Sequence, residues 1–390
     1  MRLVISSAVR TPIGAFQGAF SSVTAAELGA AAVAEAVRRA GVAPDGVDLA
    51  LIGNVLQAGQ GQAPGRQAVI KAGLAESTPA VTLNKMCGSG LEAVIQAGRA
   101  ILAGDAQVVV AGGMESMTNA PYLVPGARSG LRLGDAKLID SMIKDGLWDA
   151  YGDKHMGSCA ELCANKYAFG REAQDEYAER SYRRAQAAAE DGTFAAEIVP
   201  VEVRGRRGSV IVEKDEGPDQ VDFDKMPRLR PAFEADGTVT AANASTLNDG
   251  AAALVVTSEE VAAARGMPVV ARIHGWAGAA LAPEWFTVAP VEATTRLFDR
   301  LGWSPASVDL YEVNEAFSVV PMAVMREFGL GADVVNVHGG AVALGHPIGA
   351  SGARILVTLI NALRLKGKRR GVASICIGGG EGLALGLELA

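Results

Sequence analysis

Two halves of this chain repeat one another, and this duplication constrains the fold more than any other feature of the sequence. Three pairs of segments share residues in the same order, at shifts of 261, 262 and 266 positions. The pairs are Gly41–Leu49 with Gly302–Leu310, Ser89-Gly90 with Ser351-Gly352, and Val108–Gly113 with Ser374–Gly379. Because chance rarely produces nearly constant shifts, the sequence predicts two homologous halves.

Within the first half, helical segments alternate with short apolar strands. Ala25–Ala40 has a helical pattern of Ala, Leu and Val, and Gly41 stands just past its end, where glycine is favoured. Val47–Val55 and Val108–Ala111 are apolar enough for buried strands, with the helical segment Gly90–Leu102 between them. This alternation predicts an α/β fold with largely parallel strand pairing, in which the two halves stack face to face.

An irregular segment separates the two halves. Residues 118–248 contain loop signals and a polar helix at Arg171–Glu190. Long irregular segments in compact domains commonly act as lids or binding loops, so this insert is expected to cover a site. We therefore predict three parts: an N-terminal half made of 1–117 and 249–268, an inserted loop domain at 118–248, and a C-terminal half at 269–390.

Charge and cysteine content narrow the class of protein. A net charge of −7 argues against a nucleic-acid or membrane-surface partner, although a local basic patch can still bind a small anion. Four cysteines in 390 residues do not make a disulfide framework, which favours a reducing, cytoplasmic location. Met1–Ile5 resembles a first strand rather than a signal peptide, and no run of ~18 apolar residues predicts a membrane span.

Cys87 lies in a glycine-rich turn, Cys87–Gly90, directly before a predicted helix. The positive end of a helix stabilises a thiolate, so the sequence predicts a lowered thiol pKa and a nucleophilic cysteine. The alternative is a buried, inert cysteine, which is the common state of a free thiol. Glycines beside a reactive side chain also leave backbone N–H groups free to bind an oxyanion.

A histidine and a second cysteine occupy similar glycine-rich turns in the second half, and an asparagine follows a strand there. His346 precedes Pro347 in a glycine-rich turn. There it could take the proton of a thiol, or its ring could simply form hydrogen bonds within the turn. Cys376 ends an apolar strand before three glycines, and Asn314 follows the strand Leu310–Val313. Taken with the cysteine of the first half, these residues favour an acyl-transfer site over a disulfide or a metal cage.

Five motifs follow the opening Arg10–Gly14 in order along the chain. They are Cys87–Gly90, Gly112–Met117, Asn314–Phe317, Gly345–Pro347 and Cys376–Gly380. Together they resemble the motifs of thiolases, from Arg10 nearly to the C-terminus. The resemblance implies the thiolase fold, with two homologous βαβ-type halves stacked as a layered αβαβα core. It also implies acyl transfer between coenzyme A thioesters with Claisen formation or thiolytic cleavage of a C–C bond, no metal or redox cofactor, and a homodimer or homotetramer.

The same resemblance assigns roles to the candidate residues. Cys87 would be the nucleophile that becomes acetylated, and His346 would activate it. Cys376 would be the acid and base that removes or returns the α-proton of acetyl-CoA. Asn314 would hold a water that forms one oxyanion hole with His346, and the N–H groups of Cys87 and Gly378 would form the other.

The resemblance also implies a coenzyme A and acyl site, largely in the insert. The residues that match it are Leu147, His155, Met156, Phe233, Ala241, Ala244, Ser245, Ala316 and Phe317. His155-Met156-Gly157 is similar to the short-chain type that acts on acetyl-CoA and acetoacetyl-CoA. The sequence departs from the family at Asp219, where an arginine near the adenine is common, and at Trp285-Phe286-Thr287, which replaces a Met-Gly segment. Phe286 is therefore expected to line and reshape the acyl pocket.

Other functions fit parts of the sequence. A broader-chain 3-ketoacyl-CoA thiolase of fatty acid β-oxidation would carry the same motifs. His155, Cys159 and Cys163 are spaced as on one helix face, but a structural zinc site needs a fourth ligand, so no metal site is predicted. A redox sensor could use Cys87 and Cys376. A ketoacyl synthase would resemble a Cys-His-His site, and a non-catalytic acyl-CoA-binding protein would be expected to lack one of the three reactive residues.

Overall fold

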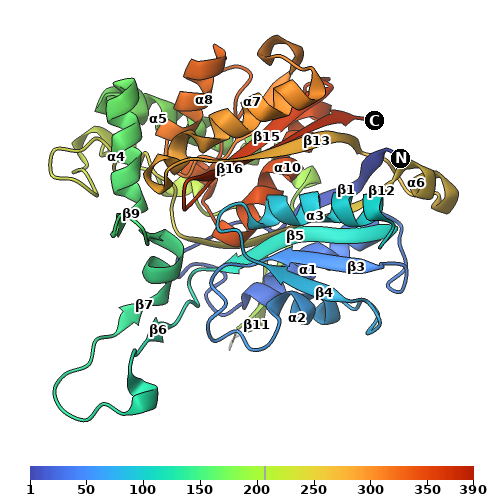
Figure 1. The fold of residues 1–390 in the computed structure, drawn as a ribbon, viewed down its shortest axis with the longest axis horizontal. Helices are drawn as coiled ribbons and strands as arrows, with labels where there is room; N and C mark the ends of the chain where they lie inside the picture. Colours follow the sequence, from blue (N-terminus) through green and yellow to red (C-terminus); the bar gives the residue numbers. More distant parts are fainter. Residues whose placement is uncertain (206–207) are drawn as a thin grey trace.

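The computed structural model describes residues 1–205 and 208–390, and its largest element is one ten-stranded sheet (Figure 1). The strands of this sheet are β1 (Leu3–Arg10), β2 (Gly14–Ala15), β3 (Leu49–Gly53), β4 (Ala80–Leu83), β5 (Val108–Ser116), β12 (Asn248–Ser258), β13 (Ala271–Ala280), β14 (Leu310–Val313), β15 (Arg370–Ile377) and β16 (Glu381–Leu389). Their order is β14-β15-β16-β13-β1-β12-β5-β3-β4, with β2 beside β12. At the junction of the two halves, β1 pairs with β13 only through Leu3–Ile5 and Ala271–Ile273.

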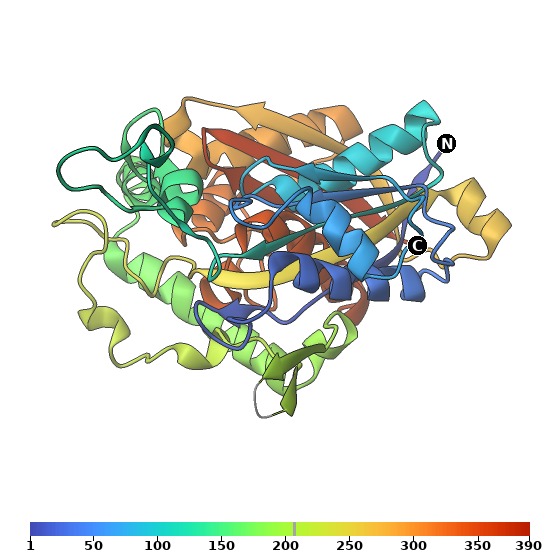
Figure 2. The ribbon, with the colours of Figure 1, turned by 90° about the horizontal axis from the view of Figure 1, so that it is seen from below.

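Helices cover both outer faces of the sheet and fill the space between its two halves (Figures 1 and 2). They are α1 (Ala25–Arg39), α2 (Pro64–Lys71), α3 (Ser89–Ala103), α4 (Met156–Tyr167), α5 (Arg171–Glu190), α6 (Glu259–Arg265), α7 (Ala289–Leu301), α8 (Val319–Phe328), α9 (Ala341–Leu344) and α10 (Ile348–Leu365). Helices α1 and α2 pack on the first half of the sheet, and α7 and α8 pack on the second half. Helices α3 and α10 lie between them in contact with each other. The predicted layered αβαβα core is therefore confirmed.

The strand register corrects one of the shifts that predicted the repeat. Leu49 of β3 pairs with Val109 of β5, and Leu310 of β14 pairs with Gly371 of β15. Since Leu49 and Leu310 are equivalent, Val109 and Gly371 are equivalent too, at a shift of 262 rather than 266 positions. The glycine pair that suggested the larger shift lies inside β5 in the first half but in the turn after β15 in the second.

Among the described strands of this sheet, the parallel neighbours are β3 with β4, β3 with β5, and β14 with β15, so the prediction of largely parallel pairing was wrong. The other neighbouring strands of this sheet run antiparallel. The connections explain the difference. The turn Gly378–Gly380 between β15 and β16 is too short for the crossover that a parallel pair requires.

The two central helices approach closely because each carries a glycine at the crossing. A Cβ on Gly90 of α3 would lie 2.7 Å from the backbone N of Ala353 in α10. A Cβ on Gly352 of α10 would in turn clash with the backbone N of Leu91 in α3. The two contacts are equivalent at the shift of 262 positions, and they bring the N-termini of both helices to one place.

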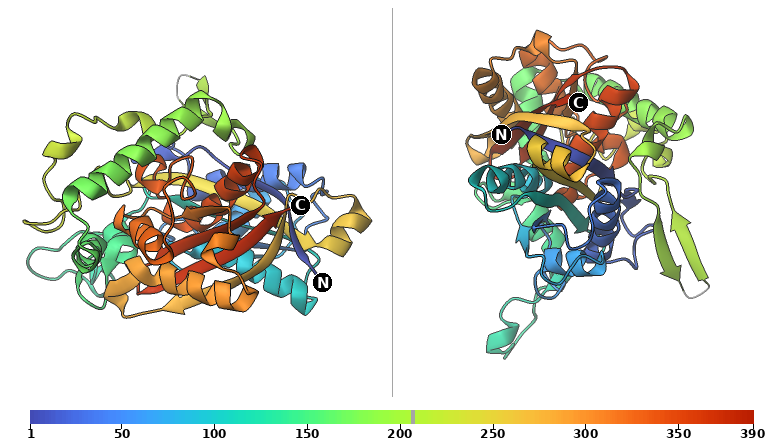
Figure 3. Two further views of the ribbon diagram at one scale, coloured as in Figure 1. Left: turned by 90° about the horizontal axis from the view of Figure 1, so that it is seen from above. Right: turned by 90° about the vertical axis from the view of Figure 1, so that its right-hand side faces the viewer.

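The insert lies along one side of the layers and projects from them in two places (Figures 1 and 3). Its short antiparallel pairs are β6 (Tyr122–Leu123) with β7 (Ile139–Asp140), β8 (Trp148–Asp149) with β9 (Lys154–His155), and β10 (Val201–Gly205) with β11 (Gly208–Val212). Helix α5 packs on α9, and α4 packs on α8. Helix α10 has the length and composition of a membrane span, but 89% of its apolar window is buried inside the fold, as in a core helix.

Candidate active site

Cys87 stands at a tight elbow between β4 and α3. Met86, the residue before it, has a φ of 46°, in the left-handed region that a side chain rarely adopts. The Ser89 hydroxyl holds the elbow, because it donates to the carbonyl of Met86 at 2.6 Å and accepts from the N–H of Lys85 at 2.8 Å. Gly88 allows close packing on the second half, since a Cβ there would lie 2.5 Å from Ile377. The elbow thus packs the cysteine closely against the end of β15 and the turn that follows it.

The thiol of Cys87 is protonated in the resting protein, contrary to the lowered pKa predicted from the sequence. Burial raises the pKa of the Cys87 thiol to about 11, and the N–H of Gly378, which donates to its sulfur, offsets only part of this rise. Part of the Cys87 side chain is open to the cavity described below, but protein surrounds the sulfur. Desolvation of the thiolate outweighs the favourable helix end, so the nucleophile needs a base.

His346 is held in one orientation and one tautomer. Its backbone N–H donates to Oδ1 of Asn248 at 2.9 Å, and its Nδ1 lies 2.6 Å from Oγ of Ser351. When the Ser351 hydroxyl donates to the carbonyl of Pro347 at 3.0 Å, its oxygen accepts the Nδ1 proton. Nε2 then carries the lone pair and has no hydrogen-bond partner in the described ranges. Burial lowers the pKa of His346 to about 3, so the ring is a neutral base at neutral pH.

Cys376 and Asn314 do not line the cavity that Cys87 and His346 share. Both side chains are fully buried. Burial and the proximity of Cys87 raise the pKa of the Cys376 thiol far above its ordinary range. The backbone of Asn314 donates to the carbonyl of Ser374 at 2.9 Å, and its Nδ2 has no partner among the residues that the structure describes. Asn314 therefore offers a buried donor beside the reactive residues.

A buried carboxylate, Glu115, ties the two halves together next to His346, and sequence reasoning missed it. Its oxygens accept from Nδ2 of Asn54 at 2.8 Å, from the N–H groups of Val55 and Leu56 at 3.0 and 3.2 Å, and from the N–H of Gly349 at 2.9 Å. Burial raises the pKa of Glu115 to about 7. The only signal in the sequence was its place in Gly112–Met117, so its partners could not be predicted.

Cys87 and His346 open into a cavity of about 240 Å³. The cavity is lined by Cys87, Met117, Gly146, Leu147, His155, Met156, Phe233, Ala244, Ser245, Thr246, Leu247, Phe286, Ala316, Phe317, His346, Ile348 and Gly378. Twelve of these were candidates from the sequence. The remaining five, Met117, Gly146, Thr246, Leu247 and Ile348, are neighbours of candidate residues along the chain or lie in or next to the motifs. Their nearness in sequence to the candidates was the signal that could have identified them. Ala241 is exposed and does not line the cavity.

Aromatic rings form one wall of the cavity. Phe233 stacks on His155 with ring centroids 4.7 Å apart, and Phe317 meets Phe233 and Phe286 edge to face at 6.0 and 6.3 Å. Gly157 allows this arrangement, because a Cβ there would run into the Phe233 ring. His155 also caps α4, since its Nδ1 accepts from the N–H of Gly157 at 3.1 Å. The wall is apolar and rigid, which suits an acyl chain rather than a charged group.

Three other segments singled out from the sequence lie away from the cavity. Cys159 and Cys163 are buried in the hydrophobic core formed by α4, α8 and the second half of the sheet. Arg10 is buried as well, and its guanidinium forms two hydrogen bonds to Asp215 at 2.7 and 2.9 Å. Asp219 is exposed just beyond this buried pair. The opening motif and the segment around Asp215 thus fix the insert to β1.

Comparisons with known proteins agree with this geometry. The sequence matches the thiolase N-terminal domain over residues 3–260 and the thiolase C-terminal domain over residues 267–389. An acetyl-CoA acetyltransferase of Pseudomonas aeruginosa is 51% identical over 387 residues, covering 99% of this chain and 98% of that protein. The Acat5 thiolase of Ascaris suum, solved in complex with coenzyme A, superposes with a TM-score of 0.96 at 44% identity, over 100% of both chains. The Bacillus anthracis acetyl-CoA acetyltransferase has a TM-score of 0.97 at 41% identity, over 100% of this chain and 99% of that chain.

Proposed function

This chain belongs to the thiolase family, and we propose that it carries the acetyl group of acetyl-CoA on Cys87. It is an acyltransferase that exchanges acyl groups between coenzyme A thioesters and forms or cleaves a C–C bond. The observation that supports the role of Cys87 is its place in one cavity wall with His346, with the Gly378 N–H directed at its sulfur. No other cysteine among the described residues lines that cavity.

In the first half-reaction, Nε2 of His346 takes the proton of the Cys87 thiol as the sulfur attacks the thioester carbonyl. The new S–C bond forms, the bond to the coenzyme A sulfur breaks, and the leaving thiolate takes the proton back from His346. The N–H groups of Cys87 and Gly378 stabilise the oxyanion. A neutral imidazole and a neutral thiol lining one cavity are the resting arrangement that this transfer requires.

In the second half-reaction, the Cys376 thiol gives its proton to Nε2 of His346, and the resulting thiolate removes the α-proton of a second acetyl-CoA. The carbanion attacks the acetyl carbonyl on Cys87, a C–C bond forms, and the Cys87 sulfur leaves and takes the proton from His346. The buried donor of Asn314, through a bound water, and His346 stabilise the enolate oxygen of the nucleophile. In the cleavage direction the raised pKa of Cys376 is suitable, because its resting thiol can return a proton to the carbanion.

The size of the cavity favours short acyl groups, namely acetyl-CoA and acetoacetyl-CoA as substrates. The cavity measures about 240 Å³, below the usual range of ~300–1,000 Å³ for ligand sites, and Phe286 fills one side of it. A broader-chain 3-ketoacyl-CoA thiolase is the second candidate and would need this wall to move. The reaction as proposed needs no metal or redox cofactor, because it transfers only acyl groups and protons. A homodimer or homotetramer and a cytoplasmic location stay predictions.

The acetyl-enzyme is tested by mixing the full chain with acetyl-CoA and mapping the modified peptide by mass spectrometry. We expect one acetyl group on Cys87 of the wild type and none on Cys87→Ser. Cys163→Ser is the matched control, since this cysteine is equally free but lies in the core away from the cavity. An acetyl group on another residue, or acetylation that survives in Cys87→Ser, would contradict the proposal.

A further inference from the structure

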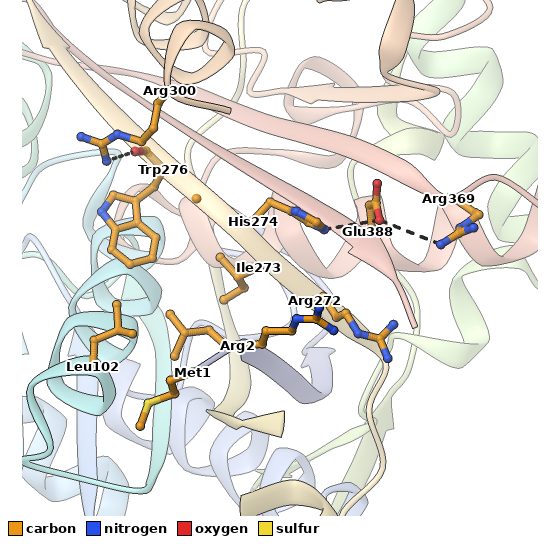
Figure 4. A pocket seen from close by; sticks show the side chains of 12 residues that line it. Met1, Arg2, Leu102, Arg272, Ile273, His274, Trp276, Arg300, Arg369 and Glu388 are labelled. Carbon is orange, nitrogen blue, oxygen red and sulfur yellow. Dashed lines mark hydrogen bonds and ion pairs between the residues drawn. The ribbon is translucent and has the colours of Figure 1, made fainter. Parts of the chain in front are cut away.

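A second pocket, of about 680 Å³, opens where the two halves of the sheet meet (Figure 4). Its walls come from β1 and α3 of the first half and from β13, α7 and β16 of the second. Arg369, on its rim, precedes β15, whereas Cys376 lies near the far end of that strand. Seven residues of extended chain separate the two, which corresponds to roughly 23 Å. This pocket is therefore remote from the candidate active site.

Guanidinium groups dominate the charge of this pocket. Its arginines are Arg2, Arg272, Arg300 and Arg369, against the single carboxylate of Glu388 in the lining. Glu388 is already engaged by Arg370 at 2.6 Å and lies 3.9 Å from Arg369. Glu259, just outside the lining, pairs with Arg272 at 2.9 Å and with Arg2 at 3.6 Å. Arg300 donates instead to the carbonyl of Trp276 at 2.6 Å, and it has no ion-pair partner in the described part of the chain.

This excess of positive charge stands out because the whole protein has a net charge of −7. Guanidinium groups present several N–H donors in a plane and match phosphate oxygens in geometry as well as in charge. An acidic protein that gathers arginines at one pocket concentrates anions there against its overall field. The charge thus predicts an anionic ligand, with phosphate as the best match.

A flat apolar surface lies beside Arg300 at one end of the pocket. Figure 4 shows the Trp276 indole between Leu102 and the Arg300 guanidinium. The indole is fixed from behind, because a Cβ on Gly98 of α3 would lie 3.1 Å from its ring atoms. A partly exposed, immobilised indole offers a stacking surface at low entropic cost. Phosphate alone does not bind such a surface, whereas a ligand that joins phosphate to a planar ring contacts both the indole and the guanidinium groups.

We propose that this pocket binds an organic phosphate with a planar heterocycle, of the nucleotide class, with the phosphates on Arg272, Arg300 and Arg369 and the ring against Trp276. Its volume lies in the range of sites for such ligands. The ligand contacts both halves at the junction where β1 and β13 share only three residues each. Binding therefore stabilises that junction and does not compete with acetyl-CoA at Cys87.

The test uses the full chain and ATP as the probe, with inorganic triphosphate and adenosine as its two separated parts. Saturable binding is followed by calorimetry and by the rise in melting temperature. We expect ATP to bind more tightly than either part. Arg300→Gln should weaken ATP binding about tenfold or more, the usual effect of losing one charge-assisted hydrogen bond. Arg296→Gln is the matched control, because Arg296 lies one turn earlier on α7 and pairs with Glu292 outside the pocket.

Three results would overturn the proposal. The first is ATP binding that Arg300→Gln and Arg369→Gln both leave unchanged, with competition by acetyl-CoA, because the nucleotide would then occupy the active site. The second is equal affinity for ATP and inorganic triphosphate with no effect of Trp276→Leu, which would leave an inorganic anion site. The third is a change in oligomeric state, measured by ultracentrifugation, in Arg300→Gln without any change in ATP binding, because the pocket would then be a contact between copies of this chain.

Discussion

Oγ of Ser351 lies 2.6 Å from Nδ1 of His346, in the first turn of the helix that follows the histidine. With the serine hydroxyl donating to the carbonyl of Pro347 at 3.0 Å, its oxygen accepts from the ring. This one contact assigns the free lone pair to Nε2, the nitrogen that a base acting on Cys87 needs. The tautomer of the proposed base is thus set by a residue that touches no substrate.

Ser351→Ala should lower kcat about tenfold or more while KM for acetyl-CoA changes little. The substitution leaves the buried Nδ1–H without its acceptor, which costs on the order of 1–3 kcal/mol and favours the wrong tautomer. Steady-state kinetics with separate kcat and KM values measures this. Thr358→Ala, on the same helix and directed at Glu197, is the control and should keep normal kcat. An equal change in both variants would assign Ser351 a structural role only.

Cys376→Ala should separate the two half-reactions. Acetyl transfer to Cys87 is expected to persist, because His346 serves that step. Condensation and thiolysis should fall by a factor on the order of 10²–10⁴, the usual scale for loss of a positioned acid or base. Intact-protein mass spectrometry and a coupled thiolysis assay on the same sample measure the two steps. Loss of acetylation together with turnover would mean that Cys376 helps to activate Cys87.

Phe286→Leu should shift the substrate preference toward longer acyl chains. The smaller side chain opens the wall that Phe286 forms with Phe317. Each extra methylene that can be buried contributes ~1–3 kcal/mol, so the ratio of kcat/KM for a six-carbon over a four-carbon 3-ketoacyl-CoA should rise about tenfold or more. Phe298→Leu, a core change on α7 away from the cavity, is the control. An unchanged ratio would place the acyl chain elsewhere.

Acidification should destabilise the wild type more than a His346→Gln variant. Burial lowers the pKa of His346 from 6.5 in the unfolded chain to about 3 in the folded protein. Between pH 6.5 and about 3, the unfolded chain therefore binds a proton on this ring that the folded protein does not bind. The contribution of the neutral ring to the free energy of unfolding is fully present above pH 6.5 and is lost as the pH falls toward the folded pKa of about 3. The difference in unfolding free energy between variant and wild type should move by about 1.4 kcal/mol per pH unit in favour of the variant. Urea unfolding at several pH values measures it, and parallel pH curves would show that His346 is not buried as a neutral ring.

The reactive residues could be found from the sequence because each lies in a short glycine-rich turn, and such turns are local features. The protonation state of Cys87 could not, because it depends on how much protein from the second half surrounds the sulfur. The role of Glu115 could not be predicted either, because its hydrogen-bond partners are distant in sequence. They come from the loop after β3 and from α10. The sequence also misplaced the equivalence of β5 and β15, because similar glycines follow different lengths of strand.

Helices α3 and α10 contact each other through equivalent residues: Gly90 packs on Ala353, and Gly352 packs on Leu91. Subunits of a two-fold symmetric dimer meet in this way, so the chain is built like a dimer whose two protomers became joined. The proposed nucleophile belongs to one protomer-like half and its base to the other. Neither half alone can therefore be a catalyst, and a side chain larger than hydrogen at either glycine would separate the two reactive groups without touching them.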